Sequence, residues 1–161
     1  AEAPGGPELR LRAVTAQDAS GAARDVFTTD QTVHVCCRYD QSAALTGLRL
    51  VVQVRTAGGD VAFTSTDHAL RGRRSFPPGR YAATCAIPGS LLNRGAYSVR
   101  VWAGIPDVRY LLRPVEAVRF RVTGLGNHGS DFPDKHAWPG VVCPRLDWSL
   151  HEETVAAHGV S

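Results

Sequence analysis

Hydrophobic and polar residues alternate with a period of two along most of the chain, and an apolar stripe with helical spacing is nearly absent. The alternation recurs in residues 9–13, 33–39, 48–55, 61–63, 81–87, 97–101, 118–122 and 141–148. Clusters of Gly, Pro, Asn and Asp separate these segments, as turns separate antiparallel strands. Such strands bury one face and leave the other to water. The sequence therefore predicts an all-β fold, an antiparallel β-sandwich of about eight strands with an immunoglobulin-like or jelly-roll arrangement.

The strand pattern divides the chain into one body with extensions at both ends. Residues 1–7 read as a flexible leader or remnant, and residues 8–122 form the sandwich body. Residues 123–140 form a loop or hinge, 141–149 a closing strand, and 150–161 a tail. A loop of this length inside a compact domain is usually functional or a linker. We therefore expect the closing strand to be able to exchange with a second subunit in a dimer.

Composition is that of a globular domain. The chain has 161 residues, of which 43% are hydrophobic and 20% charged, so a wholly disordered or fibrous protein is excluded. No stretch approaches the 18 consecutive apolar residues that a membrane-spanning helix requires. The sequence contains no methionine, even at position 1, which leads us to expect a processed product or an excised piece of a longer protein.

The net charge of +3 does not favour nucleic acid as a partner. The chain has 17 arginines and one lysine, and the arginines are scattered along it. Arg71, Arg73 and Arg74 are the one tight group, in a long polar loop predicted at residues 66–79. A nucleic-acid-binding domain more often clusters mixed basic residues on one element.

The four cysteines do not have the spacing of a disulfide framework. Cys36 and Cys37 are adjacent and point to opposite faces of a strand, while Cys85 and Cys143 are isolated. We expect unbridged thiols that act as small buried hydrophobes in a reducing compartment. The alternative is one bridge from Cys36 or Cys37 to Cys85, which would indicate an exported protein.

Motifs for catalysis are missing from the sequence. It has no phosphate-binding loop, no Gly-x-Ser-x-Gly elbow and no His-Glu-x-x-His pair. The six histidines do not fall at metal-ligand spacing with a cysteine or carboxylate. We therefore predict a protein that is not an enzyme and that has no cofactor and no metal.

Strand parity predicts a binding face instead. If Tyr97, Val99 and Val101 point into the core, the residues between them point to solvent, and the same rule applies on two further strands. A flat indole covers the apolar face of a sugar ring, and guanidinium and amide groups bind hydroxyls or an anion. The candidate carbohydrate-binding residues are Arg49, Gln53, Arg55, Arg100, Trp102, Arg119 and Arg121. The competing interpretation is that Trp102 belongs to the peripheral core and the arginines form a solvated face.

One run is more specific than alternation. Residues 85–101, CAIPGSLLNRGAYSVRV, resemble the "x-Ile-Pro-x-x-Leu-Leu-x-x-Gly-x-Tyr-x-Val-x-Val" signature of the Wzt-type C-terminal domain, which follows the ATP-binding part of polysaccharide ABC transporters. Further segments are similar to that family in the same order, although Asp30-Gln31 replaces its Gly-Glu. These segments are residues 27–35, 50–55, 59–66, 120–122, 140–142 and 147–148. The resemblance as a whole covers roughly residues 8–149.

The resemblance implies an immunoglobulin-like sandwich that recognises a lipid-linked polysaccharide of the O-antigen type, at its non-reducing-end cap, without catalysis. It further implies a homodimer, and a full-length protein with an ATP-binding domain and a transmembrane transporter subunit as partners. The location would be cytoplasmic, at the inner face of the cytoplasmic membrane. The alternative, from another class, is an immunoglobulin-like structural or adhesive domain of an exported protein.

Overall fold

The computed structural model describes residues 3–124 and 139–153. The elements in chain order are β1 (Leu9–Gln17), β2 (Val26–Thr28), β3 (Val33–Gln41), β4 (Leu45–Thr46), β5 (Arg49–Thr56), β6 (Val61–Thr66), α1 (His68–Arg71), β7 (Ser75–Phe76), β8 (Gly79–Ile87), β9 (Gly95–Ile105) and β10 (Arg109–Thr123). The described residues contain no helix that is long and apolar enough to cross a membrane.

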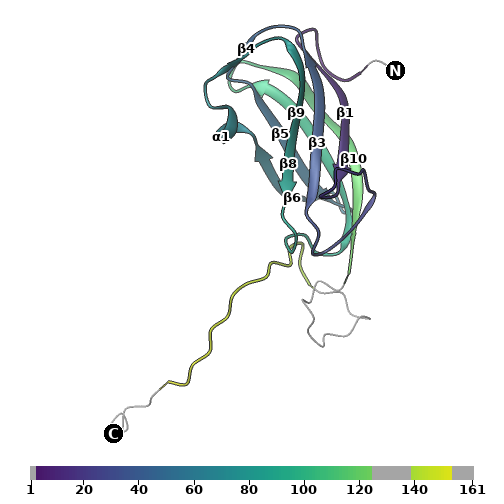
Figure 1. Cartoon of the computed structure of the whole chain (residues 1–161), viewed down its shortest axis with the longest axis vertical. Helices are drawn as coiled ribbons and strands as arrows, with labels where there is room; N and C mark the ends of the chain where they lie inside the picture. Colours follow the sequence, from purple (N-terminus) through teal and green to yellow (C-terminus); the bar gives the residue numbers. More distant parts are fainter. Residues whose placement is uncertain (1–2, 125–138, 154–161) are drawn as a thin grey trace.

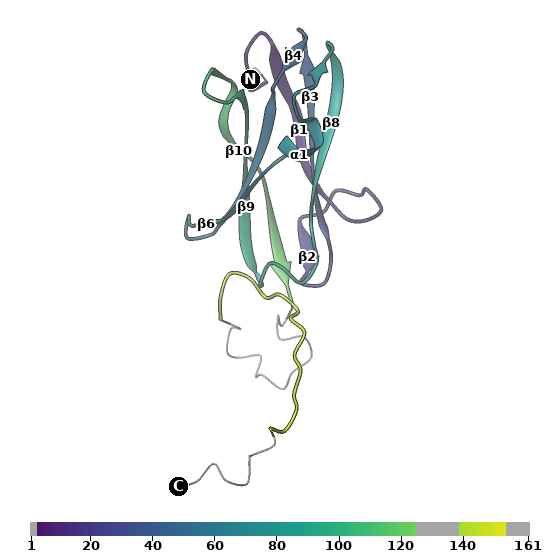
Figure 2. The same cartoon turned by 90° about the vertical axis from the view of Figure 1, so that its left-hand side faces the viewer.

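Two sheets pack face to face (Figures 1 and 2). The smaller sheet has the order β1-β3-β8 and the larger the order β2-β10-β9-β5-β6, while β4 and β7 form a small separate pair. All neighbours are antiparallel except β2, which pairs with β10 in parallel. The structure thus confirms the predicted all-β sandwich, with one parallel pair that the sequence pattern did not predict.

The core forms because the inner positions of both sheets are apolar. In β3, Val35, Cys37 and Tyr39 are at most 1% exposed, and in β9, Val99 and Val101 are fully buried. Rings from three strands fill the end of the core near β2: Phe120 lies edge-on to Phe27, with ring centres 5.8 Å apart, and is stacked on Tyr97 at 5.6 Å. This apolar layer fixes which side of each strand faces solvent.

Seven of the eight predicted segments lie in strands of the structure. The short strands β2, β4 and β7 were not predicted, because two or three residues carry no detectable alternation. The predicted polar loop 66–79 contains α1 and β7, and its Arg71 is buried. The structure gives no strand to residues 144–153.

The segment after the predicted hinge returns to the body at residues 140–143, where it lies against residues 91–93. We call this contact the clasp. The amide of Asn93 donates to the carbonyl of Val141 at 2.9 Å, and the amide of Cys143 donates to that of Leu91 at 2.7 Å. Cys143 is 2% exposed. Of the predicted hinge, residues 125–138 lie outside the described part of the chain.

Beyond the clasp the chain runs away from the sandwich in extended form (Figure 1). Its large apolar side chains are at alternate positions and are exposed: Leu146 by 68%, Trp148 by 92% and Leu150 by 99%. We call residues 144–153 the C-terminal arm. No described residue of the body covers these three side chains.

Candidate functional site

The predicted binding residues lie on one side of the larger sheet. Strands β10, β9 and β5 are neighbours in that sheet, as the sequence-based parity argument required. Across the strands, Gln53 is opposite Arg100, and Ser98 lies between Arg55 and Arg119. The seven predicted residues alternate with buried neighbours and therefore point away from the core. We call this side, with Arg49, Gln53, Arg55, Arg100, Trp102, Arg119 and Arg121, the outer face.

A polar row crosses the outer face at its centre. Arg100 lies opposite Gln53 on one side and Glu116 on the other. Glu116 accepts a hydrogen bond from Nη2 of Arg119 at 2.9 Å, and this bond is the main reason why the pKa of Glu116 lies below its ordinary value. Gln53 donates to Oγ1 of Thr64 at 3.1 Å. The row thus presents guanidinium, carboxylate and amide groups side by side.

Glu116 belongs to the outer face but was not predicted from the sequence. Simple alternation places residue 116 on the opposite side from Arg119 and Arg121. The pairing with β9 shifts register between Glu116 and Val118, which is a β-bulge. Because a bulge inserts one residue into one strand, it brings Glu116 to the same face as Arg119.

Trp102 borders an open hollow of about 490 Å³. The indole is half-buried, so it is neither a core residue nor a fully exposed one. Arg49, Asp107 and Tyr110 line the same hollow, and Tyr110 is 55% exposed. Opposite Trp102, β10 carries a second bulge between Leu112 and Val115. The hollow is thereby walled by aromatic rings and polar side chains, the combination that binds sugar rings.

Gly104 shapes this hollow. A Cβ atom added there would lie 2.7 Å from the carbonyl oxygen of Arg109, so the close approach of β9 and β10 needs a glycine. Asp107 and Tyr110 were not predicted as site residues: Asp107 lies in the β9–β10 turn, which has no strand parity, and Tyr110 precedes a shift of register in β10 that interrupts the alternation. Asp107 itself has a φ of +60°, which is typical of a tight turn.

A second hollow of about 640 Å³ lies toward the other end of the same strands. Ser98, Glu116, Arg119 and Arg121 line it, together with Asp25 from the segment before β2. Ser98 and Trp102 point to the same side of β9 and are four residues apart, which corresponds to about 13 Å along a strand. The outer face therefore offers two depressions joined by the polar row.

Arg49 and Arg55 of the outer face differ in their bonds within the protein. Nη1 of Arg49 donates to the carbonyl oxygens of Gly47, Leu48 and Gly72 at 3.1–3.3 Å, so this arginine holds the turn before β5 against the end of α1. Nε of Arg55 is shielded from solvent and has no hydrogen-bond partner among the described residues. Within the described part of the chain, the Nε–H group of Arg55 is thus an unpaired hydrogen-bond donor on the larger sheet.

The described residues contain no group of three or more His, Cys, Asp or Glu side chains that could hold a metal ion. The four cysteines are thiols, so the alternative bridge from Cys36 or Cys37 to Cys85 is not formed. Burial, with smaller contributions from Cys36 and Cys85, raises the pKa of the Cys37 thiol to about 12. This thiol is therefore protonated and unreactive at neutral pH.

The comparisons with known proteins identify the fold. No protein-family model matches the chain, and no curated protein matches it in sequence. Among solved structures, the crystal structure of the C-terminal domain of Wzt matches 91% of this chain and 86% of its own, with a TM-score of 0.69 and 15% sequence identity. The chain therefore has the fold of the Wzt C-terminal domain, as the sequence resemblance implied.

Proposed function

We propose that this chain is a non-catalytic carbohydrate-binding domain associated with a polysaccharide-exporting ABC transporter, and that its outer face binds a glycan of the O-antigen type. Two findings support the class of protein: the shared fold with the Wzt C-terminal domain over 91% of the chain, and the family-like run at residues 85–101. The fold alone does not define a ligand, so the ligand is argued from the outer face.

The observation that carries the proposal is the adjacency of β10, β9 and β5. It brings an indole, five guanidinium groups and an amide, contributed by three strands, onto one surface. The indole of Trp102 stacks on the apolar face of a sugar ring, and the polar row binds its hydroxyl groups. Two hollows, one lined by Ser98 and one by Trp102 about 13 Å away along β9, suit an elongated ligand better than a single small molecule.

The glycan end is placed in the hollow beside Trp102. Asp107 of the β9–β10 turn and Tyr110 at the start of β10 line this hollow. A chain that enters over the polar row would have its non-reducing-end cap beside Trp102 and Tyr110. In the full-length protein the domain would act at the inner face of the cytoplasmic membrane, beside an ATP-binding domain and the transmembrane subunit.

A homodimer forms part of this proposal. Leu146, Trp148 and Leu150 have the spacing of a strand that buries one face, and the body of the same chain leaves them exposed. Apolar side chains exposed in this way typically mark an interaction site. The C-terminal arm would pack on a second copy of the chain.

The test is binding of Trp102→Ala to the polysaccharide of the source organism, measured by calorimetry. We expect the variant to lose about 1–3 kcal/mol of binding free energy, the effect of removing a stacked aromatic side chain at a binding site. Arg100→Gln should also weaken binding. Arg38→Gln is the matched control, because Arg38 is exposed on β3 in the other sheet.

Thermal unfolding establishes that the variants fold. Wild-type affinity in folded Trp102→Ala and Arg100→Gln would show that the outer face is not the site. Binding should change little with salt concentration, because stacking and hydrogen bonds dominate. A steep loss of affinity with salt would instead indicate a polyanion such as nucleic acid.

A further inference from the structure

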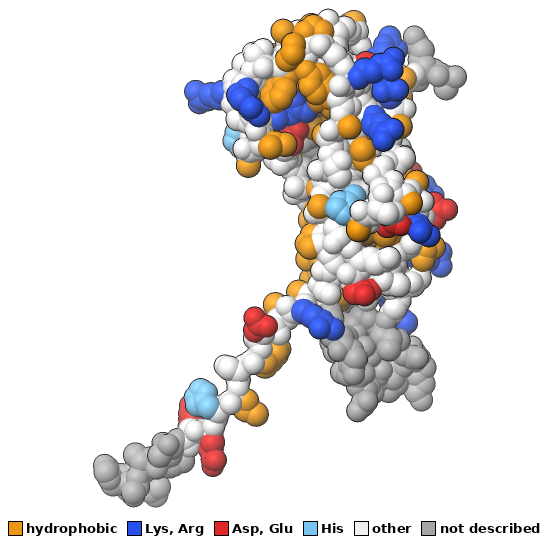
Figure 3. All heavy atoms as spheres, viewed as in Figure 1, with side chains coloured by type: hydrophobic (Ala, Val, Ile, Leu, Met, Phe, Trp, Pro, Cys, Tyr) orange, Lys and Arg blue, Asp and Glu red, His pale blue; other side chains and the backbone are white. Residues whose placement is uncertain are grey.

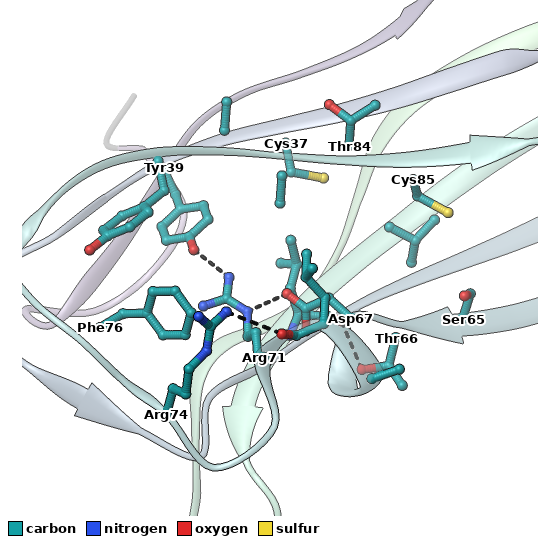
Figure 4. Close-up of a pocket in the computed structure, with 17 residues that line it drawn as sticks. Cys37, Tyr39, Ser65, Thr66, Asp67, Arg71, Arg74, Phe76, Thr84 and Cys85 are labelled. Carbon is teal, nitrogen blue, oxygen red and sulfur yellow. Dashed lines mark hydrogen bonds and ion pairs between the residues drawn. The ribbon is translucent and has the colours of Figure 1, made fainter.

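A separate cavity of about 480 Å³ lies between the two sheets on the side where the sandwich is open (Figure 4). β8 is the edge of the smaller sheet and β6 the edge of the larger, while β1 and β10 pack together on the opposite side. Inner residues of β3 and β5 form its floor, and α1 and Phe76 stand at its mouth. Its size is within the range of about 300–1,000 Å³ that is typical of small-molecule sites.

Most of the lining is apolar. Tyr81 is stacked on Tyr39 with ring centres 5.5 Å apart, and Phe76 lies edge-on to Tyr81 at 6.2 Å. Leu50 and Val52 project into the cavity from the inner side of β5, opposite to the outer face. A ligand here would therefore contact an aromatic wall and an aliphatic floor.

A buried guanidinium group interrupts this apolar lining. The Arg71 side chain is 7% exposed and points between Tyr39 and Asp67 (Figure 4). Its Nε donates to the carboxylate of Asp67, and its Nη2 donates to the hydroxyl of Tyr39. Asp67 is itself fixed, because it accepts the amide hydrogen of Leu50 at 3.0 Å. Among the described residues, Nη1 of Arg71 has no hydrogen-bond partner and remains available to a ligand.

The cavity has an excess of positive charge. The guanidinium carbons of Arg71 and Arg74 lie 5.1 and 5.2 Å from the ring centre of Phe76, so two cations share one ring. Asp67 is the one carboxylate among the described residues that line the cavity. Tyr39 does not add a negative charge, because burial raises the pKa of its hydroxyl despite the bond from Arg71. One positive charge is therefore left for a ligand to balance.

The mouth of the cavity has the same mixed character. Leu70 of α1 is 76% exposed there. Figure 3 shows hydrophobic and basic side chains gathered at the end of the molecule that carries α1 and β4. An anionic ligand with an apolar body would meet both kinds of side chain as it enters.

We propose that this cavity binds a small amphipathic carboxylate, with its apolar body between Tyr81 and the β5 floor and its carboxylate on Arg71 and Arg74. A charge-assisted bond in a partly desolvated site is stronger than one in water, and the apolar lining disfavours a sugar. The proposal does not depend on glycan binding, because the cavity and the outer face lie on opposite sides of β5.

The experiment titrates the 161-residue chain with decanoate and, separately, with decanol, and measures heat by calorimetry. We expect saturable one-to-one binding of decanoate and about tenfold weaker binding of decanol, which lacks the charge. Arg74→Gln should weaken decanoate binding by about three- to tenfold. Arg73→Gln is the matched control, because Arg73 is an exposed neighbour that does not line the cavity.

A cavity-filling variant tests the location of binding without removing a buried charge. Ala83 is half-buried and lines the cavity, so Ala83→Phe would place a ring in the proposed site. It should reduce decanoate affinity by about tenfold or more. The outer face, including Trp102, is not altered by this substitution. The proposal is wrong if decanoate does not saturate, if decanol binds equally well, or if folded Ala83→Phe binds like the wild type.

Discussion

Gly89 occupies a position where the backbone of a neighbouring loop leaves no space for a side chain. A Cβ atom at residue 89 would lie 2.1 Å from the carbonyl oxygen of Asp30. The next residue, Ser90, has a φ of +60° and donates its amide hydrogen to the carbonyl of Thr29 at 2.6 Å. The turn after β8 is thereby packed backbone to backbone on the loop before β3.

Gly89→Ala should therefore destabilise the protein. We expect a loss of about 1–3 kcal/mol in the free energy of unfolding, because the backbone must move to admit the methyl group. Urea unfolding measures this loss. Gly58→Ala is the control, since a Cβ atom there meets no atom closer than 3.8 Å. Equal stability of the two variants would contradict the packing described for residue 89.

At single residues, the sequence predicted burial where neighbours within a strand determine it and failed where distant contacts determine it. Tyr97 and Val99 are buried as alternation requires. The sequence pattern placed Arg71 in a long polar loop, yet this side chain is buried between Tyr39 and Asp67. Tyr39 lies 32 residues away in sequence, so no local pattern signals this contact.

At the scale of elements, bulges limited the prediction of the binding face. Regular alternation placed Arg100, Trp102 and Arg119 on the correct side of their strands. β10 contains three shifts of register against β9, and each one reverses the parity of the residues that follow. Glu116 was missed for this reason.

The C-terminal arm is an element without a partner in a single chain. Its pattern of Leu146, Trp148 and Leu150 matches a strand, but strand structure requires a neighbour to accept its hydrogen bonds. The clasp holds residues 140–143 to the body and leaves the arm to extend outward. The arm is thus positioned to reach a second molecule.

We expect the chain to be a dimer in solution, and the double variant Trp148→Ser/Leu150→Ser to shift it toward the monomer. The reason is that burial of two large apolar side chains is lost on each arm. Light scattering coupled to size-exclusion chromatography measures the mass. Leu70→Ser is the control, because Leu70 is similarly exposed but belongs to α1. A wild-type chain that stays monomeric at high concentration would contradict the proposed exchange.

At the scale of the whole molecule, the displaced pKa values define the pH range of stability. The pKa values of Asp18, Asp30 and Glu116 are lowered by hydrogen bonds, chiefly from Ser20, Thr28 and Arg119. Burial raises the pKa values of Cys37 and Tyr97 to about 12.

These shifts predict a stability that is constant between about pH 5 and 8 and falls on both sides. A carboxyl with a lowered folded pKa stabilises above its ordinary pKa of about 4, and this contribution is lost as the pH falls. A thiol or phenol with a raised pKa stabilises below its ordinary value and loses this contribution as the pH rises toward 12.

Urea midpoints at pH 3, 5, 7 and 10 test this dependence. Asp18→Asn should reduce the loss on the acid side, and Cys37→Val should reduce the loss on the alkaline side. A midpoint that changes strongly between pH 5 and 8 would show that another group controls stability.

The clasp also allows its own local opening to be measured through the accessibility of Cys143. Cys143 is 2% exposed and its thiol donates to the carbonyl of Leu92 at 3.1 Å, whereas Cys85 is half-buried. An alkylating reagent can attack Cys143 only after residues 140–143 detach from the body. The ratio of the labelling rates of Cys143 and Cys85 therefore measures how often the clasp opens. Mass spectrometry of the labelled peptides would follow this local opening with the chain's own cysteines, so that no residue has to be introduced.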